Sequence, residues 1–115
     1  MEESLLAANT YTERRGPDAT NAVTIEGWTL LHNLLSITGS VTKQPFIDEK
    51  KRRACFFNGE IYNWTSFGVS GITSDGQALL PLYEKYGVDF IKKLDGEFAL
   101  VLFDFELKRV VVATD

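Results

Sequence analysis

The sequence predicts an α+β fold of antiparallel strands with a helical region between them. Short β-like runs separated by turn residues fill the first half of the chain, and two more end it. Residues 75–86 carry apolar side chains at helical spacing. The run 98–103 is apolar throughout and does not alternate, so both faces of that strand are expected to be buried. One sheet packed on another, with helices outside, would meet that requirement.

The N-terminal part is expected to hold a short helix and a β-hairpin. Residues 3–14 are predicted to form the helix, and Gly16-Pro17-Asp18 ends it because proline fixes φ and removes a donor. Two β-like segments follow, Ala22 to Ile25 and Trp28 to Ile37. Glu26-Gly27 between them suits a tight turn.

The middle of the chain is predicted to alternate loop and strand. Thr38-Gly39-Ser40 closes the hairpin, and residues 41–52 are expected to form a polar loop. The basic run Lys50-Lys51-Arg52-Arg53 reads as a solvated hairpin turn and not as a nucleic-acid patch. Arg53–Phe57 is predicted as a strand, and Trp64 to Ile72 as irregular.

A capping box predicts the start of the main helix. Ser74 stands at the cap position and Gln77 follows three residues later. The helix is expected to span 75–86 and to end at Gly87. Pro81 is an objection, since a proline inside a helix removes a hydrogen bond or causes a kink.

The C-terminal part is predicted to be a helix followed by two strands. The second helix covers roughly 88–93 and leads to the turn Leu94-Asp95-Gly96. The strands are Glu97–Phe103 and Arg109–Ala113.

Composition narrows the class of protein. A chain of 115 residues is one domain at most, and 44% hydrophobic with 24% charged residues is ordinary for a globular protein. The net charge of −4 argues against a nucleic-acid partner. A single cysteine fits a reducing compartment, and neither a spanning apolar stretch nor a signal peptide is apparent. We therefore expect a cytoplasmic protein with no membrane partner.

The hexapeptide Asn58-Gly59-Glu60-Ile61-Tyr62-Asn63 is the most informative motif. It follows an apolar strand, and its first two residues offer a side-chain N–H and a backbone N–H unobstructed by a Cβ. Two adjacent donors are the parts of an oxyanion hole. The alternative is a hairpin turn, which Asn-Gly between apolar strands also favours.

Five motifs together resemble the glutaminase domain of glutamine-dependent asparagine synthetases. These enzymes are class II glutamine amidotransferases with the N-terminal-nucleophile hydrolase fold. The resemblance runs from about Glu13 to Asp115, and its five motifs occur in the family's order. They are Arg15-Gly16-Pro17-Asp18, Leu35-Ser36-Ile37, Gln44-Pro45, the hexapeptide at 58–63 and Ser74-Asp75.

The resemblance implies a four-layer αββα sandwich, incomplete at both ends of this chain. Residues 1–115 would then be part of the amidotransferase domain, without the synthetase (ATP-pyrophosphatase) domain. The expected partners are glutamine and a synthetase domain of the same or another chain. No cofactor is expected here, since ATP and Mg belong to the synthetase domain.

The resemblance also implies roles for individual residues. In the family, an N-terminal cysteine attacks the glutamine side-chain amide, and its own α-amine is the base. The Asn58 side chain and the Gly59 backbone N–H would stabilise the oxyanion, and Glu60 and Asp75 would lie near the glutamine α-amine. Asp75 has a rival explanation as an acid in the first turn of a helix. Arg15 would lie near the nucleophile, its rival reading being a solvated ion pair in a turn.

The chain departs from the family pattern at two points. Met1 is followed by Glu2 where the family has a cysteine, and Cys55 is expected to be a buried hydrophobe and no substitute. The chain alone is therefore expected to be inactive and only marginally stable. Leu34 replaces an arginine that pairs with the glutamine α-carboxylate. A non-catalytic module that binds an amino acid or a protein partner is the alternative function.

Overall fold

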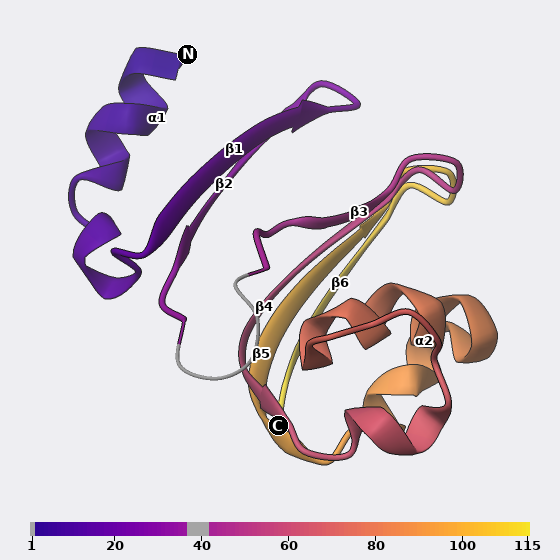
Figure 1. Cartoon of the computed structure of the whole chain (residues 1–115). Coiled ribbons are helices and arrows are strands. Elements are labelled where there is room, and N and C mark those ends of the chain that lie inside the picture. Colours follow the sequence, from indigo (N-terminus) through magenta and orange to yellow (C-terminus); the bar gives the residue numbers. More distant parts are fainter. Residues whose placement is uncertain (1, 37–41) are drawn as a thin grey trace. The chain divides into compact units, whose positions relative to one another are not determined.

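The computed structural model describes residues 2–36 and 42–115. They divide into two compact units, Met1–Pro45 and Phe46–Asp115. Both units combine helices with antiparallel strands (Figure 1), which confirms the predicted α+β class. Ile37 and Thr38-Gly39-Ser40 lie outside the described residues. In the part of the chain that is described, no helix is long and apolar enough to span a membrane.

The N-terminal unit contains a helix and a hairpin, as predicted. The hairpin strands pair in antiparallel register from Ala19–Leu34 to Ile25–Trp28. Glu26 and Gly27 have φ of 52° and 81°, the positive values that a two-residue type I′ turn requires. The expected helix over 3–14 is split in two. The elements are α1 (Glu2–Asn9), η1 (Glu13–Arg15), β1 (Ala19–Ile25) and β2 (Trp28–Leu34).

Asp18 orders the loop after Pro17. Its Oδ2 atom accepts a hydrogen bond from Ser36 N–H at 2.7 Å, and its own N–H donates to Leu34 O at 2.9 Å. These two bonds tie the start of β1 to the end of β2.

The C-terminal unit is built on a four-stranded antiparallel sheet. Its order is β3-β4-β5-β6, with bounds β3 (Phe46–Asp48), β4 (Arg53–Ile61), β5 (Gly96–Asp104) and β6 (Arg109–Thr114). The predicted loop 41–52 was wrong at 46–48, where the chain pairs with the start of β4. The basic run does form the turn between these strands and the start of β4.

β4 is longer than the sequence indicated. It continues through Asn58, Gly59 and Glu60 to Ile61, all paired with β5. The hairpin-turn reading of Asn58-Gly59 is therefore wrong. The strand continues because β5 offers a partner along its whole length, which local turn propensity does not reveal.

A helical layer covers one face of this sheet (Figure 1). It consists of η2 (Trp64–Phe67), η3 (Asp75–Ala78), α2 (Leu79–Tyr86) and η4 (Gly87–Lys93). Gln77 Oε1 accepts a hydrogen bond from Ser74 N–H at 3.0 Å, as expected of a capping box. The α-helix proper begins at Leu79, so Pro81 falls in its first turn. There a missing N–H costs no intrahelical bond, which removes the objection.

The core of this unit lies between the sheet and the helical layer. It contains side chains from β4, β5, η3, α2 and η4: Cys55, Phe57, Ile61, Ala78, Leu79, Leu80, Leu82, Tyr83, Phe90, Phe98, Leu100 and Leu102. The buried carboxylate of Asp104 borders it and accepts a hydrogen bond from Tyr83 Oη at 2.7 Å.

The expectation that both faces of β5 are buried was wrong. Phe98, Leu100 and Leu102 are buried, whereas Ala99 is exposed and Val101 is half-buried. An apolar run does not by itself fix burial, because apolar atoms make up much of the surface of folded proteins.

Candidate functional site

The end of β4 holds three of the predicted site residues. Asn58 lies opposite Ala99 on β5, Gly59 opposite Phe98, and Glu60 opposite Glu97. The strand ends at Ile61, whose side chain is buried in the core. The apolar first part of β4 therefore anchors its polar last part.

Gly59 is required by the approach of the two strands. Its φ is +133°, and an added Cβ would overlap the Glu97 carbonyl oxygen and lie 2.7 Å from Phe98 Cα. No other residue fits there without displacing backbone. From the sequence, a glycine at this position was explained by the close approach of a ligand. The structure gives a second reason, the close contact of Gly59 with the backbone of β5.

The ladder fixes the direction of the Gly59 N–H. Phe98 N–H donates to Asp115 Oδ1 at 2.9 Å, and Phe98 O accepts from Asp115 N–H at 3.1 Å. Phe98 thus directs its backbone groups away from β4, so Gly59–Phe98 is a non-hydrogen-bonded pair. Gly59 N–H consequently points to the edge of β4 that faces away from β5.

Asp75 lies at the same edge of β4. Ile61 lies two residues after Gly59, so the N–H groups of both residues point to the same side of β4. The Ile61 N–H donates to Asp75 Oδ2 at 2.9 Å. Asp75 Oδ1 accepts from Gly76 N–H, also at 2.9 Å. The carboxylate is therefore held two residues from Gly59, about 7 Å along the strand. The sequence gave no sign of this bond, because it joins residues fourteen positions apart through a backbone group.

The side chains of Asn58 and Glu60 lie on the face of the sheet opposite the helical layer. Both residues are exposed, whereas Phe57 and Ile61 on the other face are buried. Glu97 stands directly across from Glu60, a pairing of like charges that the sequence analysis missed because register is not visible in sequence.

Carboxylates make this end of the unit negative. Partial burial raises the pKa of Tyr62, and the neighbouring negative charges raise it further. Those charges are on Glu97, Glu60, Asp95 and Asp115. The arrangement favours a cationic group near the end of β4.

Two other residues singled out in the sequence lie in the N-terminal unit. Arg15 is the last residue of η1, its side chain is exposed, and its N–H donates to Thr12 O at 3.0 Å. Leu34 ends β2 opposite Ala19 and is half-buried. Among the predicted site residues, the structure thus brings together Asn58, Gly59, Glu60 and Asp75 in the C-terminal unit.

Cys55 is a buried strand residue, as predicted. Its side chain lies in the core, and burial raises the pKa of its thiol to about 12. A thiol with that pKa is protonated near neutral pH and is a poor nucleophile.

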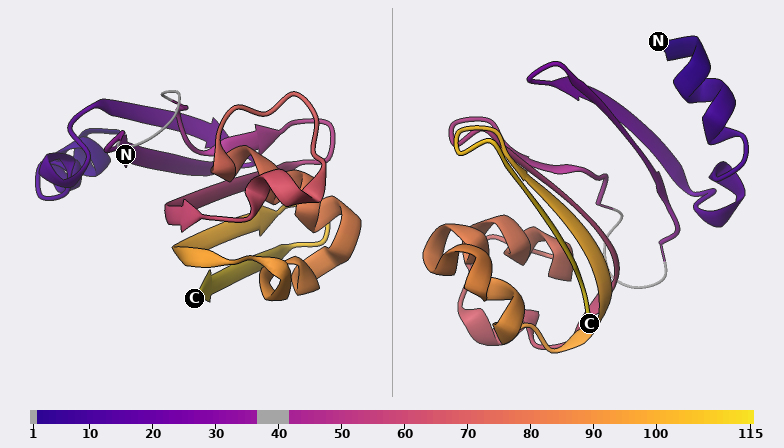
Figure 2. Two further views of the ribbon diagram at one scale, coloured as in Figure 1. Left: turned by 60° about the horizontal axis from the view of Figure 1, so that its bottom comes forward. Right: turned by 180° about the vertical axis from the view of Figure 1, so that it is seen from behind.

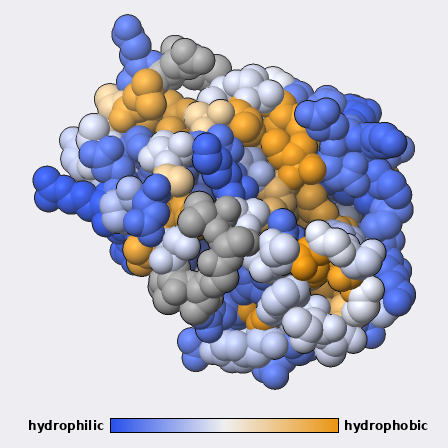
Figure 3. Space-filling view, viewed as in Figure 1, coloured by the Kyte–Doolittle hydropathy of each residue, from blue (hydrophilic) through white to orange (hydrophobic). Residues whose placement is uncertain are grey.

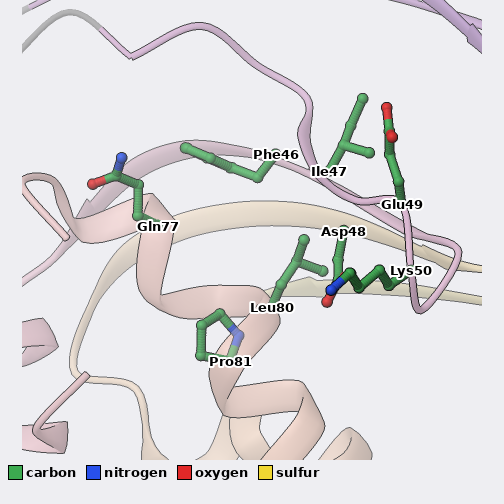
Figure 4. A pocket seen from close by; sticks show the side chains of 8 residues that line it. All are labelled: Phe46, Ile47, Asp48, Glu49, Lys50, Gln77, Leu80 and Pro81. Atoms are coloured by element: carbon green, nitrogen blue, oxygen red, sulfur yellow. The ribbon is translucent and has the colours of Figure 1, made fainter. Parts of the chain in front are cut away.

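A shallow depression of about 420 Å³ lies elsewhere in the C-terminal unit (Figure 4). Its walls come from β3 with the following turn and from η3 and α2, and its lining mixes apolar with charged side chains. None of Asn58, Gly59, Glu60 or Asp75 lines it. The depression is therefore separate from the candidate site.

Comparison with known proteins identifies the family of this chain. The family described as glutamine amidotransferase domain matches residues 1–115. Asparagine synthetase [glutamine-hydrolyzing] 2 of rice (Oryza sativa subsp. japonica) is 34% identical over 108 residues, which cover 88% of this chain and 18% of that protein. Asparagine synthetase B [glutamine-hydrolyzing] of Escherichia coli K12 is 28% identical over 123 residues, which cover 100% of this chain and 22% of that protein.

A fungal protein with a different name is equally similar. Amidase chyE of Penicillium rubens is 36% identical over 111 residues, which cover 88% of this chain and 16% of that protein. The chain spans about a fifth of the length of the curated relatives it matches. Since the family match extends over the whole chain, this protein belongs to the glutamine amidotransferase domain family and corresponds to the glutaminase portion of its asparagine synthetase relatives.

Proposed function

We propose that this chain binds glutamine as the glutaminase portion of an asparagine-synthetase-like amidotransferase. Hydrolysis of glutamine would supply ammonia for ATP-dependent amidation of aspartate in a synthetase domain of the same or another chain. ATP and Mg would bind to that domain, in a cytoplasmic setting. The observation that carries the proposal is that Gly59 N–H and the Asp75 carboxylate share one edge of β4, in a chain of this family.

The proposed oxyanion hole consists of the Asn58 side-chain amide and the Gly59 N–H. The attacked amide carbon of glutamine develops negative charge on its oxygen, and fixed N–H donors lower the energy of that state. Support comes from the ladder, which directs Gly59 N–H away from β5. The contact with Glu97 and Phe98 keeps this part of the backbone rigid.

The proposed ammonium site consists of Asp75 and Glu60. Both Asp75 oxygens accept backbone N–H groups, which fixes the carboxylate and leaves lone pairs for a further donor. The spacing of about 7 Å between Gly59 and Ile61 is comparable to the separation of the side-chain amide and α-amine in one glutamine molecule. Arg15 remains a proposed residue near the nucleophile.

The proposed complete domain is a four-layer αββα sandwich, of which residues 1–115 form a part. Its nucleophile is a cysteine with a free α-amine, which supplies both the attacking sulfur and the base. Cys55 does not fill that role, because it is internal and its thiol is buried.

Titration of the chain with L-glutamine tests the binding step. We expect saturable binding by calorimetry, weakened by Glu60→Gln and by Asp75→Asn and unchanged by Asp89→Asn, which alters an exposed acid in η4. L-glutamate, which lacks the amide nitrogen, is the ligand control. Absence of binding at ~10 mM glutamine, about ten times the upper end of ordinary KM values, would contradict the proposal.

The catalytic step requires a version of the domain with an N-terminal cysteine. In that protein, Asn58→Ala should lower kcat by roughly a hundred- to a thousand-fold with little change in KM, since an oxyanion donor acts in the transition state. A rise in KM at constant kcat would instead assign Asn58 to ground-state binding.

Leu34 tests the identity of the amide donor. The family pattern has an arginine there for the α-carboxylate of glutamine. Leu34→Arg is therefore expected to tighten glutamine binding by roughly 10- to 150-fold, which corresponds to the ~1.5–3 kcal/mol of a hydrogen bond to a charged group. Weaker binding by a folded Leu34→Arg variant would show that Leu34 packs in a differently built pocket.

A non-catalytic module that binds an amino acid or a protein partner is the second candidate. The observation in its favour is the state of Cys55, whose thiol is buried and has a pKa raised to about 12, so that it supplies no nucleophile. The two candidates differ in ammonia release by the version with an N-terminal cysteine. Glutamine binding without any release would favour the second.

A further inference from the structure

Asn58 differs from the other asparagines of the chain in the residue that follows it. Its neighbour is glycine, whereas the residues that follow the others all carry a Cβ. The others are Asn9, Asn21, Asn33 and Asn63. Because Gly59 has no Cβ, its backbone nitrogen can approach the side-chain carbonyl carbon of Asn58 closely. Asparagine is a chemically labile residue, and this dipeptide places a nucleophile and an electrophile within one possible five-membered ring.

The surroundings of the Asn58 side chain also differ from those of the other asparagines. Asn58 is exposed, on the face of the sheet opposite the helical layer that Figure 2 (right) shows, whereas the other four residues are buried or half-buried. Their side chains all form hydrogen bonds. No hydrogen bond to another residue within 2–36 and 42–115 holds the Asn58 amide in place. This amide is therefore free to turn towards its own backbone.

Exposure alone does not single out this amide. Hydrophilic residues are widespread on the face of the chain in Figure 3, among smaller hydrophobic patches. Exposure matters at Asn58 because closing the ring releases ammonia and opening it consumes water, and both molecules exchange readily at an exposed side chain.

The pairing of β4 with β5 opposes ring closure in the folded chain. Gly59–Phe98 is a non-hydrogen-bonded pair, so the preceding pair of the ladder is hydrogen-bonded. In that pair the Asn58 carbonyl oxygen accepts the Ala99 N–H. A closed ring needs the Gly59 nitrogen to eclipse the Cβ of Asn58, and an extended strand holds the nitrogen away from that position. Ring closure therefore requires the peptide group between residues 58 and 59 to rotate out of the ladder.

Two features favour local opening at this end of β4. Glu60 and Glu97 face each other directly, and like charges at opposite positions weaken a ladder. The Gly59 N–H points away from β5, so the attacking nitrogen has no hydrogen bond to β5 to lose. The buried side chain of Ile61 anchors the strand end, so the opening is a fluctuation of the native state.

We propose that Asn58 is the site at which this chain modifies itself, by loss of the side-chain amide through a cyclic imide. The Gly59 nitrogen attacks Cγ of Asn58, and the new C–N bond closes the ring. The bond between Cγ and Nδ2 breaks, and Nδ2 leaves as ammonia with the proton from the Gly59 nitrogen. Water then opens the ring at either carbonyl and gives aspartate or isoaspartate at position 58. This inference goes beyond the proposed function and does not depend on it.

The modification has a consequence that does rest on the proposed function. An ionised aspartate has no N–H, so a modified chain would lose the side-chain donor of the proposed oxyanion hole. In the version with an N-terminal cysteine, Asn58→Asp should therefore lower kcat roughly a hundredfold or more. If Asn58 is modified but Asn58→Asp keeps its kcat, the oxyanion hole is contradicted and the modification site stands.

Peptide mass spectrometry of the folded 115-residue chain, incubated at mildly alkaline pH, tests the site. The peptide that contains Asn58 should gain about one dalton before any other asparagine changes, since an amide is replaced by an acid. Chromatography should separate aspartate and isoaspartate forms, because both carbonyls of the ring can be opened. Earlier modification of another asparagine would overturn the site, and a product with aspartate alone would overturn the cyclic imide.

Comparison with the denatured chain tests the role of the ladder. In guanidinium chloride, where no strands pair, modification of Asn58 should be about tenfold faster or more. In the same denaturant Gly59→Ala should slow the modification, because a Cβ then obstructs the attacking nitrogen. Equal rates in the folded and denatured wild type would exclude control by β4. An equal rate in denatured Gly59→Ala would exclude attack by this nitrogen.

Gly96→Ala loosens the same end of the ladder without changing the dipeptide. An added Cβ at Gly96 would overlap the Glu60 carbonyl oxygen and lie 2.9 Å from Ile61 Cα. The variant, shown to be folded by circular dichroism, should modify Asn58 faster than the wild type, and at the wild-type rate in guanidinium chloride. Gly68→Ala is the matched control, since it has open space around its Cβ position and should keep the wild-type rate in both conditions. A folded Gly96→Ala variant with the wild-type rate would overturn control by the β4–β5 ladder.

Discussion

Gly59 combines a structural and a proposed catalytic requirement in one residue. Its positive φ and its contact with the β5 backbone demand glycine whether or not a ligand binds. The same contact makes Gly59 N–H a rigid donor at the open edge of β4. A glycine in a short motif is thus compatible with either role. The strand register shows that the structural requirement applies, and the catalytic role is the proposal.

Gly59→Ala is expected to destabilise the chain by about 2–5 kcal/mol. This range is the sum of two costs. Overpacking against β5 costs ~1–3 kcal/mol, and holding a residue with a Cβ at positive φ costs ~1–2 kcal/mol. Gly68→Ala is the matched control, because Gly68 has φ of 69° and open space around its Cβ position, so it incurs only the backbone term. Urea denaturation measures both. An equal loss of unfolding free energy in the two variants would mean that β5 can move away from an alanine at position 59 at no cost.

Cys55 is expected to be chemically silent in the folded chain. Its thiol is buried and its pKa is raised to about 12, so it should react slowly with iodoacetamide at pH 8 and rapidly after unfolding in urea. Mass spectrometry follows the modification. The folded 115-residue chain should also release no ammonia from glutamine through this residue. Ammonia release abolished by Cys55→Ala would overturn this assignment.

At the scale of elements, α2 is held on the sheet by a cluster of charged and polar side chains around Asp104. Tyr83 Oη donates to Asp104 Oδ2 at 2.7 Å, and Arg53 Nε lies 3.5 Å from the same oxygen. Arg53 also pairs with Glu84 and lies 5.0 Å from the centre of the Tyr83 ring. The cluster joins α2 to β4 and β5, at the end of β4 opposite to Gly59.

Asp104→Asn should cost about 1.5–3 kcal/mol of unfolding free energy, the range for hydrogen bonds to charged groups. The change keeps the shape of the side chain but removes the negative charge that faces Arg53. Asp89→Asn is the control, because its pair with Lys92 is exposed and should contribute ~0–1 kcal/mol. Similar losses for both variants would mean that the cluster contributes no more than a surface ion pair.

The contribution of Asp104 should depend on pH. Burial alone raises the pKa of this carboxyl, but the hydrogen bonds from Tyr83 and Leu107 N–H and the charge of Arg53 outweigh it, so the pKa lies below its usual value. A depressed folded-state pKa gives stability that is present above the unfolded value of ~3.9 and is lost as pH falls through the folded value. The difference between wild type and Asp104→Asn should therefore be constant near neutral pH and shrink below about pH 4. If the difference in stability instead grew as the pH fell, the pKa of Asp104 could not be lowered in the folded state, which would contradict this prediction.

At the scale of the whole molecule, the chain consists of two units with different construction. The N-terminal unit is a helix and hairpin with few buried apolar side chains, of which Leu30 is one. The C-terminal unit has a continuous core between sheet and helices. Cooperative stability should therefore reside mainly in Phe46–Asp115.

The sequence by itself determined most of the elements and the family. Two β-like segments and the Glu26-Gly27 turn located the β1–β2 hairpin, and the capping box located the start of the helical region at Ser74. These features depend on interactions between residues a few positions apart, so they can be predicted from the sequence. The motif around Asn58 was identified for the same reason.

Tertiary structure alone decided the length of β4, the hydrogen bonds of Asp75 and the burial of β5. β4 runs through Asn58-Gly59 because β5 lies beside it, and Asp75 reaches Ile61 N–H across fourteen residues. Ala99 and Val101 stay partly exposed although the run they belong to is apolar. Each outcome depends on strand register and on which face meets a neighbouring layer, quantities that a one-residue slip would change and that local sequence does not encode.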